Sequence, residues 1–246
     1  MGIRRGSIST PIIADGLVLN MDAANRASYP AQRTFAIAES GSCYNTLDLS
    51  QSGSFISDPE FVTQPVSASS WVFDGIDDYI DCGLFTPLDS GSAVTISAWF
   101  KGNTYSSGGR LVNVEKHVEI FQGSSGASNT RGRFTYSLMG PYGNSFTTLG
   151  GADPLPDLCD GNWHHLCFVF EGATLTATAY EDGVAAVTGT TTKSNLYDGT
   201  DKLYIGADPA GANPTAGNIA NVHIYPRALS ANEVLHNYNA LKGRFA

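Results

Sequence analysis

The chain has 246 residues, of which 42% are hydrophobic, 15% are charged and 27 are glycine. This composition can bury a core and excludes a disordered protein, while many glycines and few charges favour short strands joined by tight turns. A single domain is expected at this length. The formal net charge of −9 opposes binding to nucleic acid, because phosphate backbones are bound through Lys and Arg.

The sequence carries no sign of membrane insertion or secretion. It has no run of about 18 apolar residues, and no apolar signal segment follows Arg4 and Arg5. We therefore expect a soluble protein without membrane insertion. The four cysteines lack zinc-site spacing and are too few for a disulfide scaffold, so we expect buried or free thiols at Cys43, Cys82, Cys159 and Cys167.

In chain order, most predicted elements are short strands. Their apolar residues alternate or run together between Gly, Asp and Asn, and their spacing favours a sandwich over βαβ units. The region 23–70 has the weakest pattern, and 102–109, 123–132 and 141–156 are predicted loops. The predicted strands are 17–21, 71–73, 79–82, 94–100, 110–114, 118–121, 134–139, 163–170, 175–180, 184–187, 203–205 and 219–225.

One hairpin is specified locally, because Asp182-Gly183 favours a tight turn between two strands of period 2. Alternation predicts one solvated and one packed face in its first strand. The solvated face is expected to carry Thr174, Thr176 and Thr178, and the packed face Leu175, Ala177 and Ala179.

A single helix is predicted near the C-terminal end of the sequence. Ser230 and Glu233 have the spacing of a capping box, and Gly243 is placed to end the helix. An apolar stripe is predicted for docking on the sandwich, formed by Val234, Leu235, Tyr238 and Leu241.

Five segments in order resemble the concanavalin A-like lectin/glucanase superfamily in its laminin-G-like form. They are 16–22 (GLVLNMD), 73–80 (FDGIDDYI), 94–100 (VTISAWF), 160–165 (DGNWHH) and 217–230 (GNIANVHIYPRALS). The resemblance implies an all-β fold, an antiparallel jelly-roll β-sandwich with a short C-terminal helix. It places the domain at 15–246, after an N-terminal arm at 1–14.

The two ends of the chain, including 237–245, are similar to structural proteins of marine bacteriophages. This similarity implies a virion surface protein, such as a capsid decoration, knob, horn or tail-fibre component, made in the host cytoplasm and extracellular after release. Other virion proteins would then be its partners, contacted through Arg4 and Arg5 of the arm, in a homo-oligomer or symmetric assembly. A free carbohydrate-binding lectin is the alternative.

A calcium site is one expectation, because several carboxylates gather in one turn and hard cations bind oxygen ligands. Laminin-G-like domains often bind calcium in this way, with an Asp where this chain has Asn221. The expected ligands are Asp74, Asp77, Asp78 and Asn221. The alternative is a set of turn-forming aspartates that accept hydrogen bonds from backbone amides.

Loop aromatics are the candidates for glycan binding, because an aromatic ring stacks on the apolar face of a sugar while amides bind its hydroxyls. The candidates are Tyr105, Tyr142, Phe146, Asn103 and Asn144. Isolated surface aromatics without any function remain the alternative.

An enzyme is not expected, and no catalytic residue is assigned. Glucanases of this superfamily use an acidic triad on one strand, and a strand over 114–120 would place Glu115, His117 and Glu119 on one face. The histidine replaces the central acid, and the outer Cα atoms would lie about 13 Å apart, so a glucanase-like hydrolase is the less favoured alternative. His164 and His165 are expected to be structural.

Overall fold

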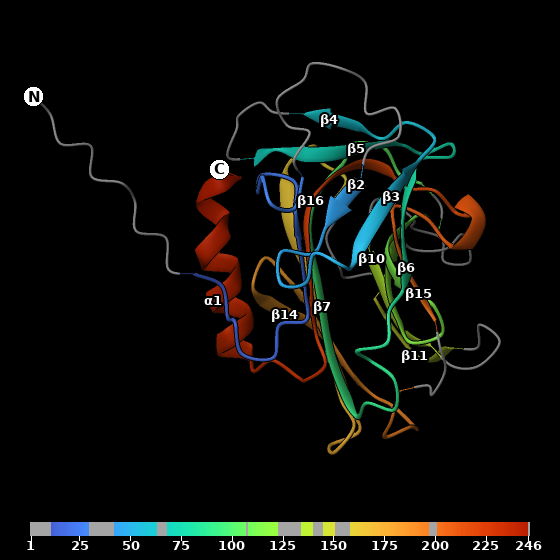
Figure 1. Ribbon diagram of the computed structural model, residues 1–246. Helices are drawn as coiled ribbons and strands as arrows, with labels where there is room; N and C mark the ends of the chain where they lie inside the picture. The colour runs from blue at the N-terminus through green and yellow to red at the C-terminus, as the bar shows by residue number, and fades with distance from the viewer. Residues whose placement is uncertain are drawn as a thin grey trace, which may run out of the picture.

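The computed structural model describes residues 11–29, 42–62, 68–106, 108–122, 134–139, 145–150, 158–196 and 201–245. Two antiparallel sheets face one another, and one helix lies outside the first of them (Figure 1). This is the predicted concanavalin A-like sandwich. None of the helices in these ranges is long and apolar enough to span a membrane.

Sheet 1 is built around two long central strands, β7 (Ala93–Lys101) and β16 (Ala216–Tyr225). One edge of β16 pairs with two strands in succession, β5 near its start and β1 near its end. The order across the sheet is β14 (Val184–Thr190), β13 (Thr176–Glu181), β12 (Trp163–Glu171), β7, β16, β5 (Ser70–Asp74) and β4 (Glu60–Val62), with β1 (Leu19–Asp22) also beside β16.

Sheet 2 faces sheet 1 across the core and contains the remaining strands. Its order is β11 (Ser145–Gly150), β10 (Phe134–Met139), β9 (Val118–Gln122), β8 (Arg110–Val114), β15 (Lys202–Ile205), β6 (Tyr79–Leu84), β3 (Ser52–Ile56) and β2 (Ser42–Tyr44). The 3-10 helix η3 (Pro209–Gly211) follows β15.

The core lies between the sheets and is lined by alternate residues of each strand. Trp71, Phe73, Phe100, Phe168 and Phe170 are among its largest buried side chains. Burial of an apolar side chain contributes about 1.5–3 kcal/mol relative to exposure. This alternation leaves the other residues of the same strands on the outer faces of the two sheets, where the candidate sites lie.

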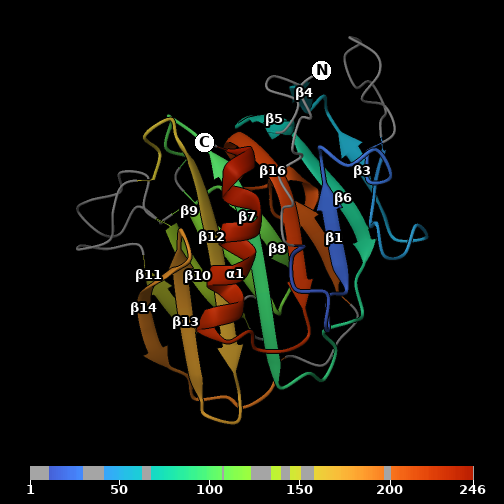
Figure 2. The same ribbon diagram turned by 90° about the vertical axis from the view of Figure 1, so that its left-hand side faces the viewer.

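A helix covers part of the outer face of sheet 1 (Figure 2). α1 (Ala231–Leu241) begins with the predicted capping box, in which the Ser230 hydroxyl accepts from the Glu233 amide and the Glu233 carboxylate accepts from Ser230. Val234 is fully buried in a second apolar cluster with Tyr225 and Leu229. The segment preceding β1 also docks here, since the Ile13 amide donates to Asn237 Oδ1 at 2.8 Å.

Two details of the predicted helix are wrong. Leu235 is 41% exposed, because the buried side of α1 is the one that carries Val234 and Asn237. Asn237 donates a hydrogen bond there to the Tyr225 hydroxyl. Gly243 does not end the helix in a left-handed turn, since α1 ends at Leu241 and continues into the 3-10 turn η4 (Lys242–Arg244).

The predicted Asp182-Gly183 hairpin is present, with φ of 52° and 79° at the two turn residues. One residue of the flanking pattern differs, because Leu175 has φ of 54° and belongs to the preceding turn, where it is 41% exposed. Ala177 and Ala179 are buried as predicted.

Four strands were not predicted from the sequence. β2, β3 and β4 lie in the region of weakest pattern, and β11 lies in a predicted loop. Three of the four contain few large apolar residues and several serines, threonines or glycines. β3 and β11 pair with the predicted strands β6 and β10, and β2 pairs with β3 at the edge of the sheet.

Candidate functional site

A tight turn between Asp160 and His164 presents Trp163 at the start of β12. Asp160 accepts hydrogen bonds from the amide and side chain of Asn162 at 2.8 and 2.9 Å, and these bonds lower the pKa of Asp160 to about 2. Gly161 has φ of 84°, which a residue with a Cβ rarely adopts. The turn is therefore locally fixed.

The His164 side chain contacts both this turn and the β13–β14 hairpin. Its Nδ1 lies 2.8 Å from Asp182 Oδ2 and its Nε2 lies 3.2 Å from Asp160 Oδ1. The hydrogen bond with Asp182 is the main cause of the raised pKa of His164. The expected structural role of His164 agrees with these contacts.

A hollow of about 400 Å³ opens beside this turn on the outer face of sheet 1. The rings of Trp163 and Phe245 form an aromatic wall, with centroids 4.9 Å apart and planes inclined by 47°. Phe245 in turn stacks on the buried Trp99 at 4.3 Å, which holds the wall in place. The lining residues are Ala68, Lys101, Gly161, Asn162, Trp163, Arg244 and Phe245.

Strand register places two lining residues, Trp163 and Lys101, side by side, with Asn218 next to Lys101. Trp163 pairs with Lys101, and Lys101 pairs with Asn218, so the three side chains share one face of sheet 1. Arg244 is fixed at the edge by Asp22, with two N–H···O contacts of 2.8 Å. The hollow thus combines aromatic, amide and cationic groups on rigid strands.

The predicted glycan-binding residues do not all meet here. Asn103 is exposed and lies next to Gly161, whereas Tyr105 is half-buried in the same loop. Tyr142, Asn144 and the side chain of Phe146 lie outside the described residues. Sequence reasoning missed Trp163, although a tryptophan in an Asp-Gly turn was the signal that could have identified it.

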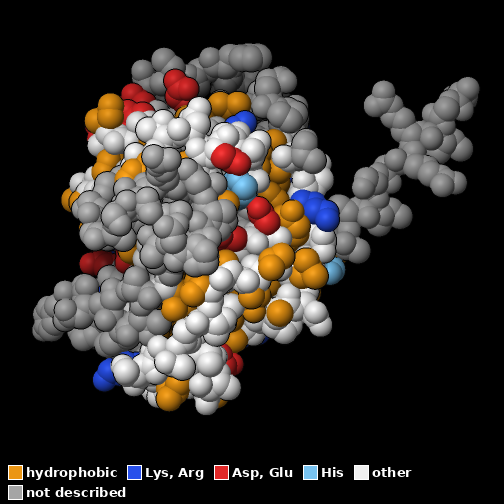
Figure 3. Space-filling view, turned by 180° about the vertical axis from the view of Figure 1, so that it is seen from behind, with side chains coloured by type: hydrophobic (Ala, Val, Ile, Leu, Met, Phe, Trp, Pro, Cys, Tyr) orange, Lys and Arg blue, Asp and Glu red, His pale blue; other side chains and the backbone are white. Residues whose placement is uncertain are grey.

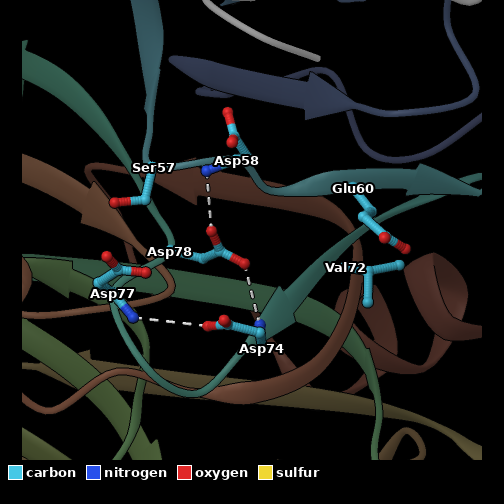
Figure 4. A pocket seen from close by; sticks show the side chains of 7 residues that line it. All are labelled: Ser57, Asp58, Glu60, Val72, Asp74, Asp77 and Asp78. Carbon is cyan, nitrogen blue, oxygen red and sulfur yellow. Dashed lines mark hydrogen bonds between the residues drawn. The ribbon is translucent and has the colours of Figure 1, made fainter. Parts of the chain in front are cut away.

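A second hollow, of about 590 Å³, is strongly acidic (Figure 4). Asp74, Asp77 and Asp78 each offer a carboxylate oxygen within 4.8 Å of the others. Asp78 accepts from the backbone amides of Asp58 and Asp74, both at 3.0 Å. Burial, together with the like charges around it, raises the pKa of Asp78 to about 6. Asp58 and Glu60 complete the acidic lining.

Asn221, the fourth expected metal ligand, is not part of this cluster. Asp74 pairs with Ala216 at the start of β16, whereas Asn221 pairs with Trp99 and Asp22 five residues further along. At about 3.3 Å per residue this separation is about 17 Å. Asn221 is instead fully buried on the outer face of sheet 1.

The expected strand over 114–120 is wrong. Lys116 has φ of 61°, and the chain turns back between β8 and β9, so Glu115, His117 and Glu119 do not lie along one strand. Glu115 is half-buried in the turn, and His117 is buried with Asp201 3.5 Å from its Nδ1.

Glu119 lies instead in a polar row on the outer face of sheet 2, paired with Asn113 and Ser137. Arg110 Nε lies 2.9 Å from Glu119 and 3.2 Å from Asp208, so one guanidinium joins both carboxylates. Burial raises the pKa of Glu119 to about 7 despite Arg110, and Asp208 adds to the rise.

The chain matches a known protein family over more than half of its length. A family model described as the concanavalin A-like lectin/glucanases superfamily, in its laminin-G form, matches residues 74–235. The chain belongs to this superfamily. No curated protein sequence matches it.

Solved structures of other concanavalin A-like domains share its fold. Domain 4 of AbnA, an extracellular arabinanase of Geobacillus stearothermophilus solved with arabinotriose, is 17% identical, with a TM-score of 0.55 over 90% of this chain and 98% of that one. The binding domain of botulinum neurotoxin DC, solved with rat synaptotagmin II, has a TM-score of 0.62 at 10% identity over 92% of this chain.

A third structure, of botulinum neurotoxin type C, whose cell entry depends on two ganglioside molecules, has a TM-score of 0.64 at 10% identity over 92% of this chain. The chain spans about half of each toxin chain, 52% and 51% respectively. At these identities the likenesses establish the concanavalin A-like fold alone.

Proposed function

We propose that this concanavalin A-like domain binds glycans, without cleaving them, in the hollow beside Trp163. The observation that carries the proposal is the aromatic wall of Trp163 and Phe245 next to Asn162 and Lys101 on a rigid sheet face. A sugar ring would stack its apolar face on Trp163 while the polar groups bind its hydroxyls. A volume of about 400 Å³ lies within the usual range of small-ligand sites.

The absence of catalysis is proposed from the contacts of three acids, Glu119, Asp208 and Asp78. Glycoside hydrolysis needs two carboxyl groups that face one glycosidic bond. Glu119 and Asp208 are instead both joined to Arg110, and both oxygens of Asp78 accept backbone amides. These acids are engaged in structural contacts.

The similar structures support sugar binding and name one other class of partner. The AbnA domain was solved with arabinotriose, and the type C toxin depends on gangliosides, whereas the DC toxin was solved with a protein. If no glycan binds, binding to a protein is the alternative to test.

A glycan array followed by calorimetric titration tests the proposal. Trp163→Ala is expected to reduce affinity for the best array ligand by about ten- to a hundredfold, since stacking and its buried area are lost. Tyr105→Ala, a half-buried loop aromatic outside the lining of the hollow, is the matched control and is expected to bind normally. Equal affinities of Trp163→Ala and the unmodified chain would contradict the proposal.

We also propose that the acidic hollow holds calcium. Its donor set fits a hard cation, since three carboxylates converge and the raised pKa of Asp78 reflects burial and repulsion that a cation would relieve. Asp74, Asp77 and Asp78 would hold the ion, and its positive charge would offset the repulsion among their carboxylates.

The place of the domain on a virion surface is part of the same proposal. It rests on the similarity of the chain ends to bacteriophage structural proteins. Arg4 and Arg5, the proposed contacts with other virion proteins, lie outside the described residues. Mass spectrometry and immunogold labelling of purified particles test it, and a chain absent from every particle would contradict it.

A further inference from the structure

We infer that the hollow beside Trp163 selects sugars that carry an acidic group, a carboxylate or a sulfate, through Lys101. This inference rests on the proposed glycan binding and names the class of glycan. Lys101 ends β7 and lines the hollow between Trp163 and Asn218.

The charge of the hollow is opposite to that of the protein. The described residues that line it include two cations, Lys101 and Arg244, and no carboxylate, although the chain carries a formal net charge of −9. Lys and Arg side chains are sparse on the described surface seen from behind (Figure 3). A cationic hollow in an acidic protein indicates an anionic ligand.

The two cations have different roles. The Arg244 guanidinium is bound by the Asp22 carboxylate and lies 5.2 Å from the Phe245 ring centroid, so it is held at the edge of the hollow. Among the described residues, no carboxylate lies within ion-pair distance of Lys101. Lys101 therefore supplies the charge that an acidic sugar would neutralise.

The neighbouring acidic hollow does not cancel this charge. Asn218 pairs with Lys101 on one side and Val72 on the other, and Val72 lines the acidic hollow. Two strand spacings separate Lys101 from Val72, about 10 Å, which exceeds the screening length of about 8 Å at physiological salt. The acidic residues therefore do not neutralise the charge at Lys101. They also repel an acidic group from the region near Asp74.

Calorimetric titration with three oligosaccharides tests the inference. The probes are a polyuronate, the same oligosaccharide with its carboxyl groups reduced to alcohols, and a sulfated galactan. The chain is expected to bind the polyuronate, the sulfated galactan or both about tenfold or more tightly than the reduced form, because charge-assisted hydrogen bonds are the strong ones. A loss of affinity on reduction of the carboxyl groups assigns the carboxylate, whereas binding of the sulfated galactan that is lost in Lys101→Gln assigns the sulfate.

Two lysine variants separate a local effect from overall charge. Lys101→Gln is expected to lose the preference and to bind acidic and reduced probes equally, whereas Lys193→Gln, an exposed lysine outside the lining of the hollow, is expected to keep it. If the reduced probe binds as tightly as the acidic ones, and both depend on Trp163, the inference fails while glycan binding stands. If no glycan depends on Trp163, the proposed function itself fails.

Discussion

At the scale of the residue, His164 shows how one side chain fixes the candidate site. It joins the Trp163 turn to the β13–β14 hairpin through Asp160 and Asp182. All three side chains are partly exposed, so solvent screening reduces the strength of these contacts.

We predict that His164→Ala lowers the free energy of unfolding by about 1–2 kcal/mol at pH 6. Because the folded pKa of His164 is raised, its contribution is complete below the ordinary value of about 6.5 and is lost as pH rises through the folded pKa. Urea unfolding at pH 6 and pH 9 checks this. An equal loss at both pH values would show that the charge of His164 does not matter.

A second prediction at this scale concerns Asp77, an exposed member of the acidic cluster. Calcium is expected to raise the Tm of the chain, and Asp77→Asn is expected to reduce the rise because a neutral amide binds the ion less tightly. Differential scanning calorimetry with calcium or with a chelator measures this. Asp15→Asn, outside the cluster, is the control, and the same rise in all three proteins would exclude a calcium site at Asp77.

At the scale of the element, the capping box decides where α1 begins. Ser230→Ala removes the acceptor of the Glu233 amide and is expected to cost about 1 kcal/mol of stability. For a domain of this size the Tm would fall by about 2–4 °C. Thr192→Ala, an exposed residue outside any helix or strand, is the control in thermal unfolding. An unchanged Tm in Ser230→Ala would mean that the cap does not support the docked helix.

Elements with a dense local signal were predictable from the sequence. The capping box of Ser230 and the Asp182-Gly183 hairpin are encoded within a few residues, and both are present. Strands such as β2 and β11 were not, because their sequences, SCY and SFTTLG, carry no clear alternation of apolar and polar residues. The turn carrying Trp163 was recognised as a family motif, but the place of the Trp163 ring in the lining of a hollow was not predicted.

The rest of the candidate site depends on register, which local patterns do not encode. Lys101, Asn218 and Trp163 come from three strands far apart in sequence and meet only because β7 pairs with both β12 and β16. The same register separates Asn221 from the acidic cluster, so the four expected calcium ligands do not all lie together.

At the scale of the whole molecule, burial beneath α1 makes stability depend on pH. His165 stands against Trp99 on the outer face of sheet 1, and neither of its ring nitrogens has a hydrogen-bond partner among the described residues. Burial, assisted by the repulsion that a protonated His223 would exert, lowers the pKa of His165 to about 3. At His165 the folded state therefore binds fewer protons than the unfolded state below pH of about 6.5.

We predict that His165→Gln becomes more stable relative to the unmodified chain as pH falls from 6 to 4. The difference should change by about 1.4 kcal/mol per pH unit, because the variant no longer has to keep this histidine neutral. Using the difference between two proteins removes the opposing contributions of Glu119 and Glu181, whose pKa values are raised to about 7 mainly by burial. His236→Gln is the control, and a constant difference for His165→Gln would contradict the predicted shift.

The central claim, that a glycan stacks on Trp163, is tested most directly by acrylamide quenching of tryptophan fluorescence. The chain has three tryptophans, and Trp71 and Trp99 are only 0% and 2% exposed, so the quenchable emission belongs to Trp163. We predict that a saturating concentration of the best array ligand protects this emission from acrylamide. Unchanged quenching while the glycan is demonstrably bound would place the sugar elsewhere and contradict the account.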